Sequence, residues 1–502
     1  MKQLSGLDNT FLTMETDSQF GHVSSVSIYE RPDDPAFQPY EAWRAAIEKR
    51  LHLLEPLRRR LVEVPYAIDH PYWAEDPDFD LDYHVRHTAL PPPGGDAQMS
   101  KLVARLIGRP LDRKRPLWES YVVEGLADDR FAVFTKVHHA TVDGASGAEL
   151  LMLMLDSTPE GDEIAPPEHE WKPERIPSDV EVMNLAALNL LRKPGRALLL
   201  SARAAREIGK ATRNPVLTAA AQQWRSSLQG PLGAVLNIGR SREEDRDPPP
   251  PLPSFRAPRT PWNRTITPHR NFAFQSTSLE AIKAIKNAMG ATVNDIVMGA
   301  CTGGLRSYLE EKGQLPDEPL VAMVPVSIRT GNETDKWTNR VSGLVASLPT
   351  NEPDLAERVR KVHEAMNASK EMFNAIPADM LTDFAQFPAP AIFTRATRMA
   401  TRFRLGDRLN PPVNLVISNV PGPRTPLYST GARLVHYYPV STVTDGQGLN
   451  ITVQSYLDTL DFGLVSCREL VPDLDHLLDL IIDEIEAMAK VTSIDVPVRQ
   501  AV

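Results

Sequence analysis

Two adjacent histidines, followed by an aspartate and a glycine, are the residues of this chain best suited to chemistry. They are His138, His139, Asp143 and Gly144. The apolar segment Phe131–Val137 directly before them predicts a buried strand. An imidazole titrates near a pH of about 6.5, so it can accept and return a proton at neutral pH. A strand that ends in this way predicts a site of general acid–base chemistry.

Other interpretations of these residues have to be weighed first. Neighbouring residues of an extended chain point to opposite faces, so His138 and His139 are poorly placed to share one metal ion. A serine hydrolase would need a G-x-S-x-G turn, and Ser146 lies too close to the histidines to be an obvious nucleophile. Either histidine could also be an ordinary core residue, and Asp143 could cap the helix that follows.

Several segments resemble known families. His138-His139-x-x-x-Asp143-Gly144 resembles the HHxxxDG motif of the coenzyme-A-dependent acyltransferase superfamily, which includes chloramphenicol acetyltransferases and the condensation domains of peptide synthetases. Further segments are similar to bacterial wax ester synthase/diacylglycerol acyltransferases: Leu4–Phe11, the PLW motif Pro116-Leu117-Trp118, the ND motif Asn294-Asp295, and Ser418–Pro423. These segments run in the expected order along nearly the whole chain.

The resemblance implies an acyl-CoA-dependent O-acyltransferase. A long-chain acyl group would move from coenzyme A to diacylglycerol or to a long-chain fatty alcohol, which makes triacylglycerol or wax ester. His139 would be the general base, beside His138 and Asp143, and no covalent acyl-enzyme would form. The reaction would need no metal and no cofactor beyond the coenzyme A thioester as co-substrate.

The resemblance also implies roles for residues around the histidines. Asp143 is expected to pair with an arginine, for which Arg329 is the candidate, and Gly144 to keep the channel open unless it is an ordinary turn glycine. Trp118 is expected to fill core volume rather than to contact substrate. Thr292-Val-Asn-Asp295 fits a helix capping box, so Asp295 is expected to be structural, whereas Asn294 could form a hydrogen bond near the site.

The elements that must hold these residues suggest two halves. A chain of 502 residues is too long for one ordinary core. We predict an α/β fold with mixed sheets, in which two halves, residues 1–160 and 266–502, are joined by a helical, proline-bounded linker at 161–265. The resemblance implies that each half is chloramphenicol-acetyltransferase-like. The active site would lie in a channel between the halves.

The hydrophobic patterns predict individual elements. Strands are expected at 23–28, 131–137, 320–328, 341–348 and 414–420, with a hairpin formed by 449–456 and 462–467. Helices are expected at 40–54, 148–155, 279–289, 294–308 and 476–490, with Gly290 ending one of them.

Charge and composition limit the partners. The formal net charge of −10 argues against a nucleic-acid-binding protein. Two cysteines far apart, Cys301 and Cys467, exclude a disulfide framework. We expect no signal peptide and no membrane span, because the N-terminal residues have no apolar core of signal-peptide length and no stretch is apolar over a membrane's width; a cytoplasmic protein is therefore expected. Arginines and lysines between Arg192 and Arg213 predict a basic amphipathic helix that contacts a membrane or lipid inclusion peripherally; a helix packed on its own protein is the alternative.

Two other functions remain open at this point. A condensation-type acyltransferase would take its acyl group from a carrier-protein thioester, but the chain contains no segment that resembles a carrier or adenylation domain. A non-catalytic relative that binds lipid inclusions would not need the intact His138-His139 pair.

Overall fold

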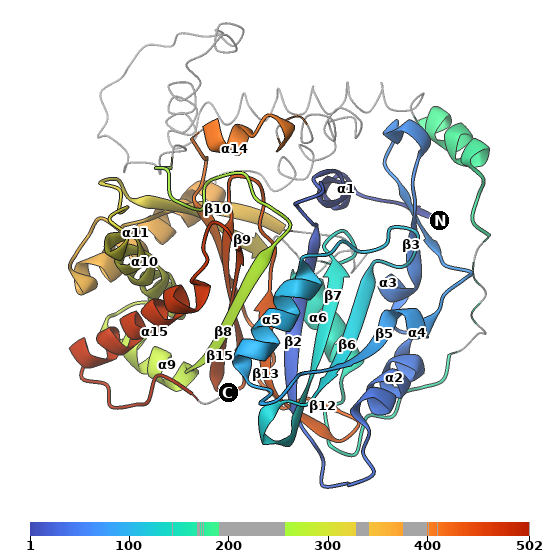
Figure 1. The fold of residues 1–502 in the computed structure, drawn as a ribbon, viewed down its shortest axis with the longest axis horizontal. Coiled ribbons are helices and arrows are strands. Elements are labelled where there is room, and N and C mark those ends of the chain that lie inside the picture. Colours follow the sequence, from blue (N-terminus) through green and yellow to red (C-terminus); the bar gives the residue numbers. More distant parts are fainter. Residues whose placement is uncertain are drawn as a thin grey trace, which may run out of the picture.

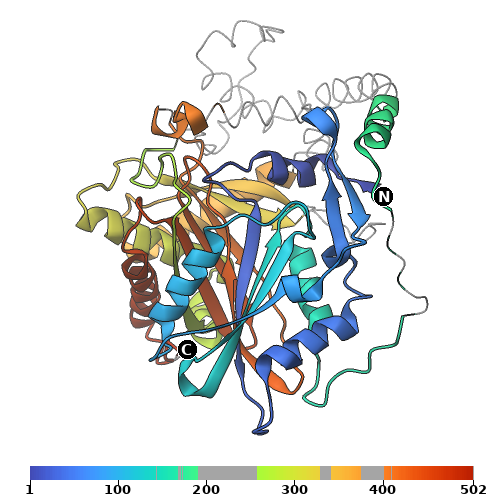
Figure 2. The same ribbon diagram turned by 45° about the vertical axis from the view of Figure 1, so that its right-hand side comes forward.

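The computed structural model describes residues 1–142, 144–167, 171, 173, 175–189, 257–327, 341–374, 399, 401–408 and 410–500. Within these ranges the longer strands form two six-stranded sheets, and a third sheet has three short strands. The two large sheets stand side by side, each with helices on its outer side (Figures 1 and 2). The predicted α/β class with mixed sheets is confirmed.

The first sheet contains strands from both ends of the chain. Its strands, in spatial order, are β12 (Tyr428–Ser429), β13 (Ala432–Val440), β2 (His22–Glu30), β7 (Arg130–His138), β6 (Trp118–Glu124) and β5 (Val85–Ala89). Neighbours pair antiparallel, except that β5 and β6 run parallel. β13 pairs along nearly the whole of β2. A segment from the C-terminal part of the chain therefore completes the sheet that carries the histidines.

The helices around this sheet are short. They are α1 (Gly6–Thr13), α2 (Pro39–Arg50), α3 (Glu55–Arg58), α4 (Leu81–His84), α5 (Asp96–Ile107) and α6 (Gly144–Met154), with 3-10 turns at Pro65–Ala67 and Ala127–Asp129. The small sheet has the order β1 (Lys2–Gln3), β4 (Tyr72–Glu75), β3 (Arg59–Val62). Leu12 of α1 shares a buried cluster with Leu117 and Ala140, so α1 packs beside the histidine pair.

The second sheet and its helices form the larger hydrophobic core. Its strands, in spatial order, are β10 (Val341–Leu348), β9 (Leu320–Ser327), β11 (Leu415–Val420), β14 (Leu449–Tyr456), β15 (Thr459–Cys467) and β8 (Arg270–Ser278). The covering helices are α9 (Leu279–Ala288), α10 (Val293–Glu311), α11 (Leu355–Asn374) and α15 (Leu474–Val491), and the short α14 (Leu405–Arg408) lies at the upper edge in Figure 1.

Glycines bring α10 and α15 unusually close together. A Cβ atom on Gly304 would lie 2.5 Å from Ile481 Cγ1 and 2.8 Å from the Ile481 backbone. A Cβ on Gly303 would lie 2.2 Å from the Glu484 side chain. Helix α15 is amphipathic and buries Ile481, Ile482 and Ile485. Because the glycines of α10 have no side chains, this apolar face of α15 packs directly against the α10 backbone.

Helix α5 joins the two halves. Its apolar residues Met99, Leu102, Val103, Leu106 and Ile107 are buried. They share one cluster with residues of β2 and β7 in the first sheet and of β8 and β15 in the second. The two halves therefore have a continuous apolar contact rather than a solvated cleft along this side.

Most predicted elements are present. Strands β2, β7, β9, β10, β11 and the β14–β15 hairpin, and helices α6, α9, α10 and α15, cover the predicted segments. Gly290 has a φ of 63°, which suits its predicted place after α9. The helix predicted at 40–54 is too long, because α2 ends at Arg50 and a turn leads to the proline that opens α3.

The predicted division at residues 160 and 266 stays a prediction, with the addition that 428–440 lie in the first sheet. Residues 179–189 are helical, and residues 190–256 of the predicted linker lie outside the described residues. In the described part of the chain, no helix combines the length and the apolar character needed to cross a membrane.

Candidate active site

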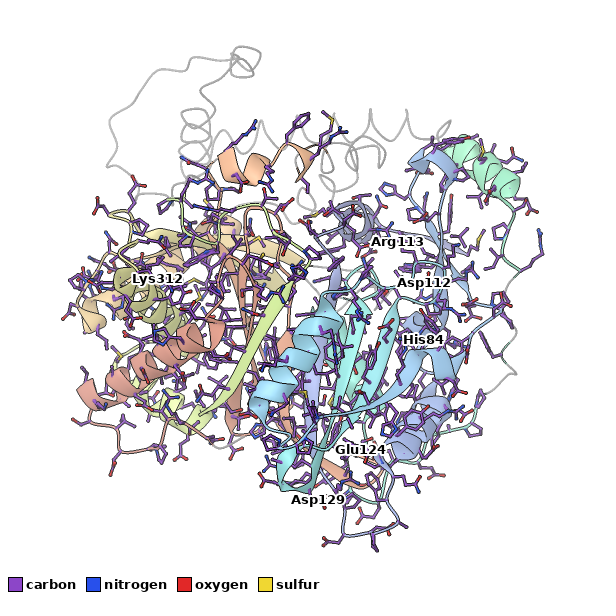
Figure 3. All side chains as sticks on the ribbon, in the orientation of Figure 1. His84, Asp112, Arg113, Glu124, Asp129 and Lys312 are labelled. Carbon is purple, nitrogen blue, oxygen red and sulfur yellow. The ribbon has the colours of Figure 1, made fainter. Side chains whose placement is uncertain are left out.

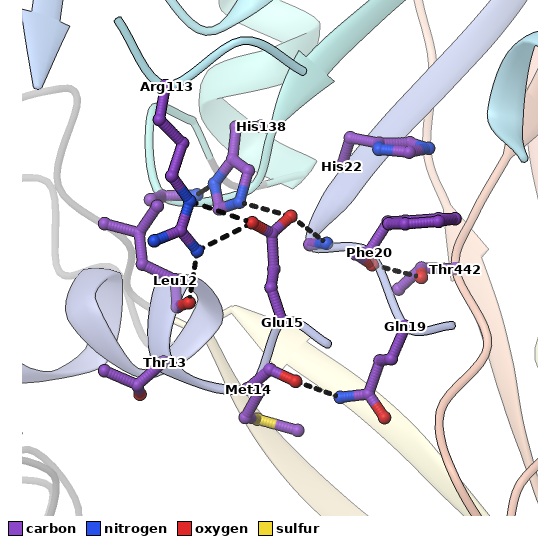
Figure 4. A network of polar contacts seen from close by, with 12 residues as sticks. Leu12, Thr13, Met14, Glu15, Gln19, Phe20, His22, Arg113, His138 and Thr442 are labelled. Atoms are coloured by element: carbon purple, nitrogen blue, oxygen red, sulfur yellow. Dashed lines mark hydrogen bonds and ion pairs between the residues drawn. The ribbon is translucent and has the colours of Figure 1, made fainter. Parts of the chain in front are cut away.

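His138 is buried, and both of its ring nitrogens have partners. The side chain is 1 % exposed. Its Nδ1 accepts a hydrogen bond from the Ala140 amide (3.0 Å), and its Nε2 lies 3.2 Å from Glu15 Oε1 (Figure 4). Because Nδ1 is an acceptor, the ring proton belongs on Nε2, where it is donated to the carboxylate. His138 is thus fixed in one tautomer and one orientation.

Glu15 gathers donors from three separate segments. Its Oε1 also accepts from the Gly21 amide (2.8 Å), and Arg113 donates to Oε2 from Nη2 (2.7 Å) and Nε (3.2 Å). Burial alone would raise the pKa of Glu15, but the contacts with His138, Arg113 and Gly21 lower this pKa to about 2. The ionised carboxylate therefore ties the end of α1 to the end of β7.

Gly21 lies against the buried histidine. A Cβ atom on residue 21 would come within 2.7 Å of His138 Nε2 and 2.8 Å of the Phe11 carbonyl oxygen. The carbonyl of Gly21 accepts a hydrogen bond from the His139 amide (2.8 Å). Only glycine leaves room for this approach, so the segment that precedes β2 sets the backbone position of His139.

His139 has different surroundings from His138. Its ring stacks on Phe11 of α1, with centroids 4.0 Å apart and planes 9° apart. The residue is half-buried rather than buried. The second imidazole of the pair is therefore oriented by an aromatic ring and by its backbone, and it is the less buried of the two.

The PLW segment, Pro116-Leu117-Trp118, is buried and forms a backbone hydrogen bond to His138. Trp118 is 1 % exposed, donates from Nε1 to the Leu57 carbonyl (2.7 Å) and stacks on His84 at 4.6 Å. Figure 3 labels His84 on the side of the first sheet that faces away from the second half. The Leu117 carbonyl accepts from the His138 amide (2.9 Å). The prediction that Trp118 fills core volume is confirmed, and Pro116 lies directly before this support.

Burial keeps two further rings of this region neutral. Burial lowers the pKa of His84 to about 4, so its Nδ1 donates as a neutral imidazole to the Trp118 carbonyl (2.8 Å). His22, which pairs with His138 across β2 and β7, has its pKa lowered well below the usual value, first by burial. Burial also lowers the pKa of Lys136, whose amine lies 3.3 Å from Glu119.

The ND motif opens α10, in the second half. Asp295 forms the predicted capping box with Thr292 and accepts from His363 Nδ1 (2.7 Å). Burial opposes the charge of Asp295, yet the hydrogen bonds from His363 and Thr292 lower its pKa. The capping box predicted from Thr292 and Asp295 is therefore present, and the role of Asp295 in the site stays a prediction. Asn294 accepts a bond of 3.5 Å from Asn419, at the end of β11.

The remaining predicted residues are placed only in part. Asp143 and Arg329 lie outside the described residues, so their predicted pairing stays a prediction. Gly144 is the first residue of α6. Among the described residues, no three His, Cys, Asp or Glu side chains converge as metal ligands would.

The sequence patterns missed Glu15, Gly21, Phe11 and Arg113. These residues lie far from the histidines in sequence, and no fixed spacing links them to the motif. The one available signal was that Phe11 belongs to the Leu4–Phe11 segment quoted for the family resemblance.

The histidine site also adjoins the second half. The Phe20 carbonyl accepts from Thr442 Oγ1 (2.7 Å), and Gln19 Oε1 accepts from the Asp445 amide (2.9 Å). The segment that holds His139 is therefore part of the junction between the halves. The channel itself stays a prediction.

Comparisons with known proteins agree with this arrangement. Residues 4–297 match the family model for the wax ester synthase/diacylglycerol acyltransferase catalytic domain, and residues 337–489 match the model for the C-terminal domain of the same family. The chain is 32 % identical over 491 residues to O-acyltransferase WSD of Acinetobacter baylyi, covering 97 % of this chain and 96 % of that protein. A Mycobacterium tuberculosis protein that carries the name diacylglycerol O-acyltransferase as a prediction is 35 % identical over 480 residues, covering 95 % and 88 %.

Solved structures show the same relationship. The wax ester synthase/diacylglycerol acyltransferase of Marinobacter aquaeolei VT8 matches with a TM-score of 0.67 and 29 % identity, covering 98 % of this chain and 100 % of that one. The first condensation domain of the calcium-dependent antibiotic synthetase shares the fold, with a TM-score of 0.55 and 14 % identity, covering 98 % and 97 %. The two family models and these matches over nearly the whole chain show that the chain belongs to the wax ester synthase/diacylglycerol acyltransferase family.

Proposed function

We propose that this chain transfers a long-chain fatty acyl group from coenzyme A to the hydroxyl group of diacylglycerol or of a long-chain alcohol. The observation that carries the proposal is the half-buried ring of His139, stacked on Phe11 at the end of β7 in a chain of this family. Relatives whose names describe O-acyltransferases support the reaction class.

In this mechanism His139 is the general base. Its neutral imidazole removes the proton from the acceptor hydroxyl, and the oxygen attacks the thioester carbonyl. The tetrahedral intermediate collapses and expels the thiolate of coenzyme A. A thiol with a pKa of about 8.5 is a far better leaving group than an alcohol, so the intermediate collapses towards the ester. The acyl group passes directly to the acceptor, without a covalent acyl-enzyme.

The surrounding residues have positioning roles. Phe11 and the Gly21 carbonyl orient His139, while Glu15 and His138 hold the segments to which these two residues belong. Asp143 would pair with Arg329, as the family resemblance implies. If Arg329→Ala left both folding and turnover intact, that pairing would have to be abandoned.

A test compares wild type with two histidine variants. The purified chain is incubated with radiolabelled palmitoyl-CoA and either diolein or hexadecanol. His139→Ala should lower turnover by about 10²–10⁴-fold, the usual contribution of a positioned base. His476→Ala is the matched control, because this histidine is 47 % exposed and pairs with Glu311 on α10. The His476→Ala variant should keep the wild-type rate. The acceptor that gives more labelled ester shows whether triacylglycerol or wax ester is the main product.

A folded His139→Ala variant that kept the wild-type rate would contradict the assignment of the base. Absence of labelled ester with either acceptor from wild-type protein would contradict the proposed reaction as a whole.

We also propose peripheral contact with a membrane or lipid inclusion, since the acceptors are insoluble. Helical residues 179–189 support this, because Val180, Met183, Leu185 and Leu188 are exposed apolar side chains directly before the basic segment 192–213. Removing 192–213 should lower the fraction that floats with anionic vesicles. Equal flotation of both chains would count against membrane contact through this segment.

A further inference from the structure

Two adjoining hollows lie where residues 257–270 meet α14 at the surface of the second half. Their volumes are ≈ 480 Å³ and ≈ 680 Å³. Arg259, Arg264 and Leu470 line both of them. Arg404 and Asp407 line the larger hollow, and Glu469 lines the smaller. We call these two hollows the arginine pocket.

The three arginines of the pocket differ in how they are used. Arg259 Nη2 donates to the Asn263 carbonyl (3.2 Å) and the Gly406 carbonyl (2.9 Å), so it clamps the two walls together. Arg264 and Arg404 are exposed, and within the described part of the chain their guanidinium groups have no ion pair or hydrogen bond. These two cations are free to receive a ligand.

The carboxylates of the pocket are already engaged. Asp407 Oδ1 accepts from the Thr265 amide (2.9 Å). Glu469 accepts from Thr267 Oγ1 (2.6 Å) and lies 2.8 Å from His269 Nδ1. Neither acid pairs with Arg264 or Arg404, and with three arginines against two carboxylates the lining carries an excess of one positive charge. This contrasts with the whole chain, whose formal net charge is −10.

Backbone contacts connect the pocket to the histidine site. The Arg264 carbonyl accepts a hydrogen bond from the Gly446 amide (3.0 Å). The amide of the preceding residue, Asp445, donates to Gln19 Oε1 (2.9 Å). Two residues after Gln19, the Gly21 carbonyl holds the His139 amide. The pocket therefore lies on the same junction between the halves as His139, separated from it by two short segments.

We infer that the arginine pocket binds the phosphate groups of the acyl donor, at the 3′,5′-ADP end of coenzyme A. Coenzyme A carries a pyrophosphate and a 3′-phosphate on one nucleotide, joined to the thioester by a long, flexible arm. Guanidinium forks bind phosphate oxygens in pairs, and a hollow holds a compact polyanion better than a flat surface does. The inference rests on the proposed function, because it assumes this donor.

The test combines arginine variants with a shortened donor. Arg264→Gln and Arg404→Gln should each raise the KM for palmitoyl-CoA by about tenfold, the value of one charged hydrogen bond. Neither should change kcat/KM for palmitoyl-pantetheine, which lacks the nucleotide. Arg408→Gln is the matched control, since Arg408 is exposed on α14 but does not line the pocket. It should leave both donors unaffected.

A binding measurement separates this inference from the proposed function. Calorimetric titration with 3′,5′-ADP requires no turnover. Wild type should bind this nucleotide, and the double variant that combines Arg264→Gln with Arg404→Gln should not. Equal binding by both would overturn the inference even if the enzyme is active. Binding lost in the double variant would support the pocket even if no ester is formed.

Anionic lipid headgroups also carry phosphate groups, so a vesicle flotation experiment distinguishes a lipid from coenzyme A as the ligand of the pocket. Flotation with phosphatidylglycerol vesicles should be the same for wild type and the double variant. Lost flotation with an unchanged KM for palmitoyl-CoA would assign the pocket to lipid instead of coenzyme A, and would overturn the inference.

Discussion

His138 and His139 are neighbours in sequence but have different surroundings. The first is buried between Glu15 and the Ala140 amide, and the second stacks on Phe11 at a half-buried position. A single tautomer of His138 satisfies both contacts, which suits a fixed support. In the proposed mechanism, His139 carries out the proton transfer and His138 holds the surrounding segments in place.

Glu15 should stabilise the fold in a pH-dependent way. Its pKa in the folded chain is about 2, below the usual 4.5, so its contribution is fully present above pH 4.5 and is lost as the pH falls towards 2. Glu15→Gln should lower the free energy of unfolding by roughly 3 kcal/mol at pH 7 and by much less near the acid end. Urea unfolding of both proteins at several pH values measures this difference.

Glu63→Gln is the matched control for that experiment. Glu63 accepts from the other terminal nitrogen of Arg113 (3.2 Å), but its side chain is 60 % exposed. Exposed ion pairs contribute about 0–1 kcal/mol, so this variant should unfold almost like wild type at every pH. Equal losses in the two variants would mean that Arg113, rather than the buried carboxylate, is the source of the stability.

Site residues could be predicted from the sequence when all residues of a motif lie within one short segment. The histidine motif, the capping box of Asp295 and the buried Trp118 each lie within one short segment. Glu15 and Arg113 reach His138 from separate segments, and tertiary folding alone brings them together. No pattern in one sequence encodes that convergence.

At the scale of elements, the α10–α15 contact depends on missing side chains. Alanine in place of glycine within a helix usually stabilises by about 0.5–1 kcal/mol. Gly304→Ala should instead destabilise by about 1–3 kcal/mol, because the new methyl group would meet the Ile481 backbone 2.8 Å away. Thermal or urea unfolding measures the change.

Gly147→Ala on α6 provides the comparison, because a Cβ there has no heavy atom within 4 Å. This variant should be as stable as wild type or slightly more stable. If Gly304→Ala behaved in the same way, the two helices would have to be able to move apart at little cost.

Helices and strands with a clear hydrophobic periodicity could be predicted from the sequence, whereas elements without such a periodicity could not. The β14–β15 hairpin alternates and is closed by a short turn, so its sequence is sufficient. Strands β8 and β13 were missed because several of their buried residues are polar, such as Ser276 and Ser278 of β8 and His436 of β13, which obscures an alternation of apolar and polar residues. Helix α5 was also missed, although its apolar residues have the spacing of an amphipathic helix and could have revealed it.

At the scale of the whole molecule, the two sheets are joined by polar as well as apolar contacts. Ser276 of β8 donates to Asp461 of β15 (2.6 Å) and lies 2.8 Å from the hydroxyl of Tyr438 on β13. All three side chains are buried. β13 belongs to the first sheet and its partners to the second, so this cluster fixes the relative position of the sheets behind the proposed site.

The exchange of β13 between the halves also affects how the chain is made. During synthesis β2 and β7 emerge early, whereas β13, which covers the other edge of β2, is the last strand of this sheet to appear. Until residues 432–440 leave the ribosome, β2 presents an open row of amides and carbonyls, the kind of edge that recruits other strands. The histidine-bearing sheet can therefore be completed only near the end of translation.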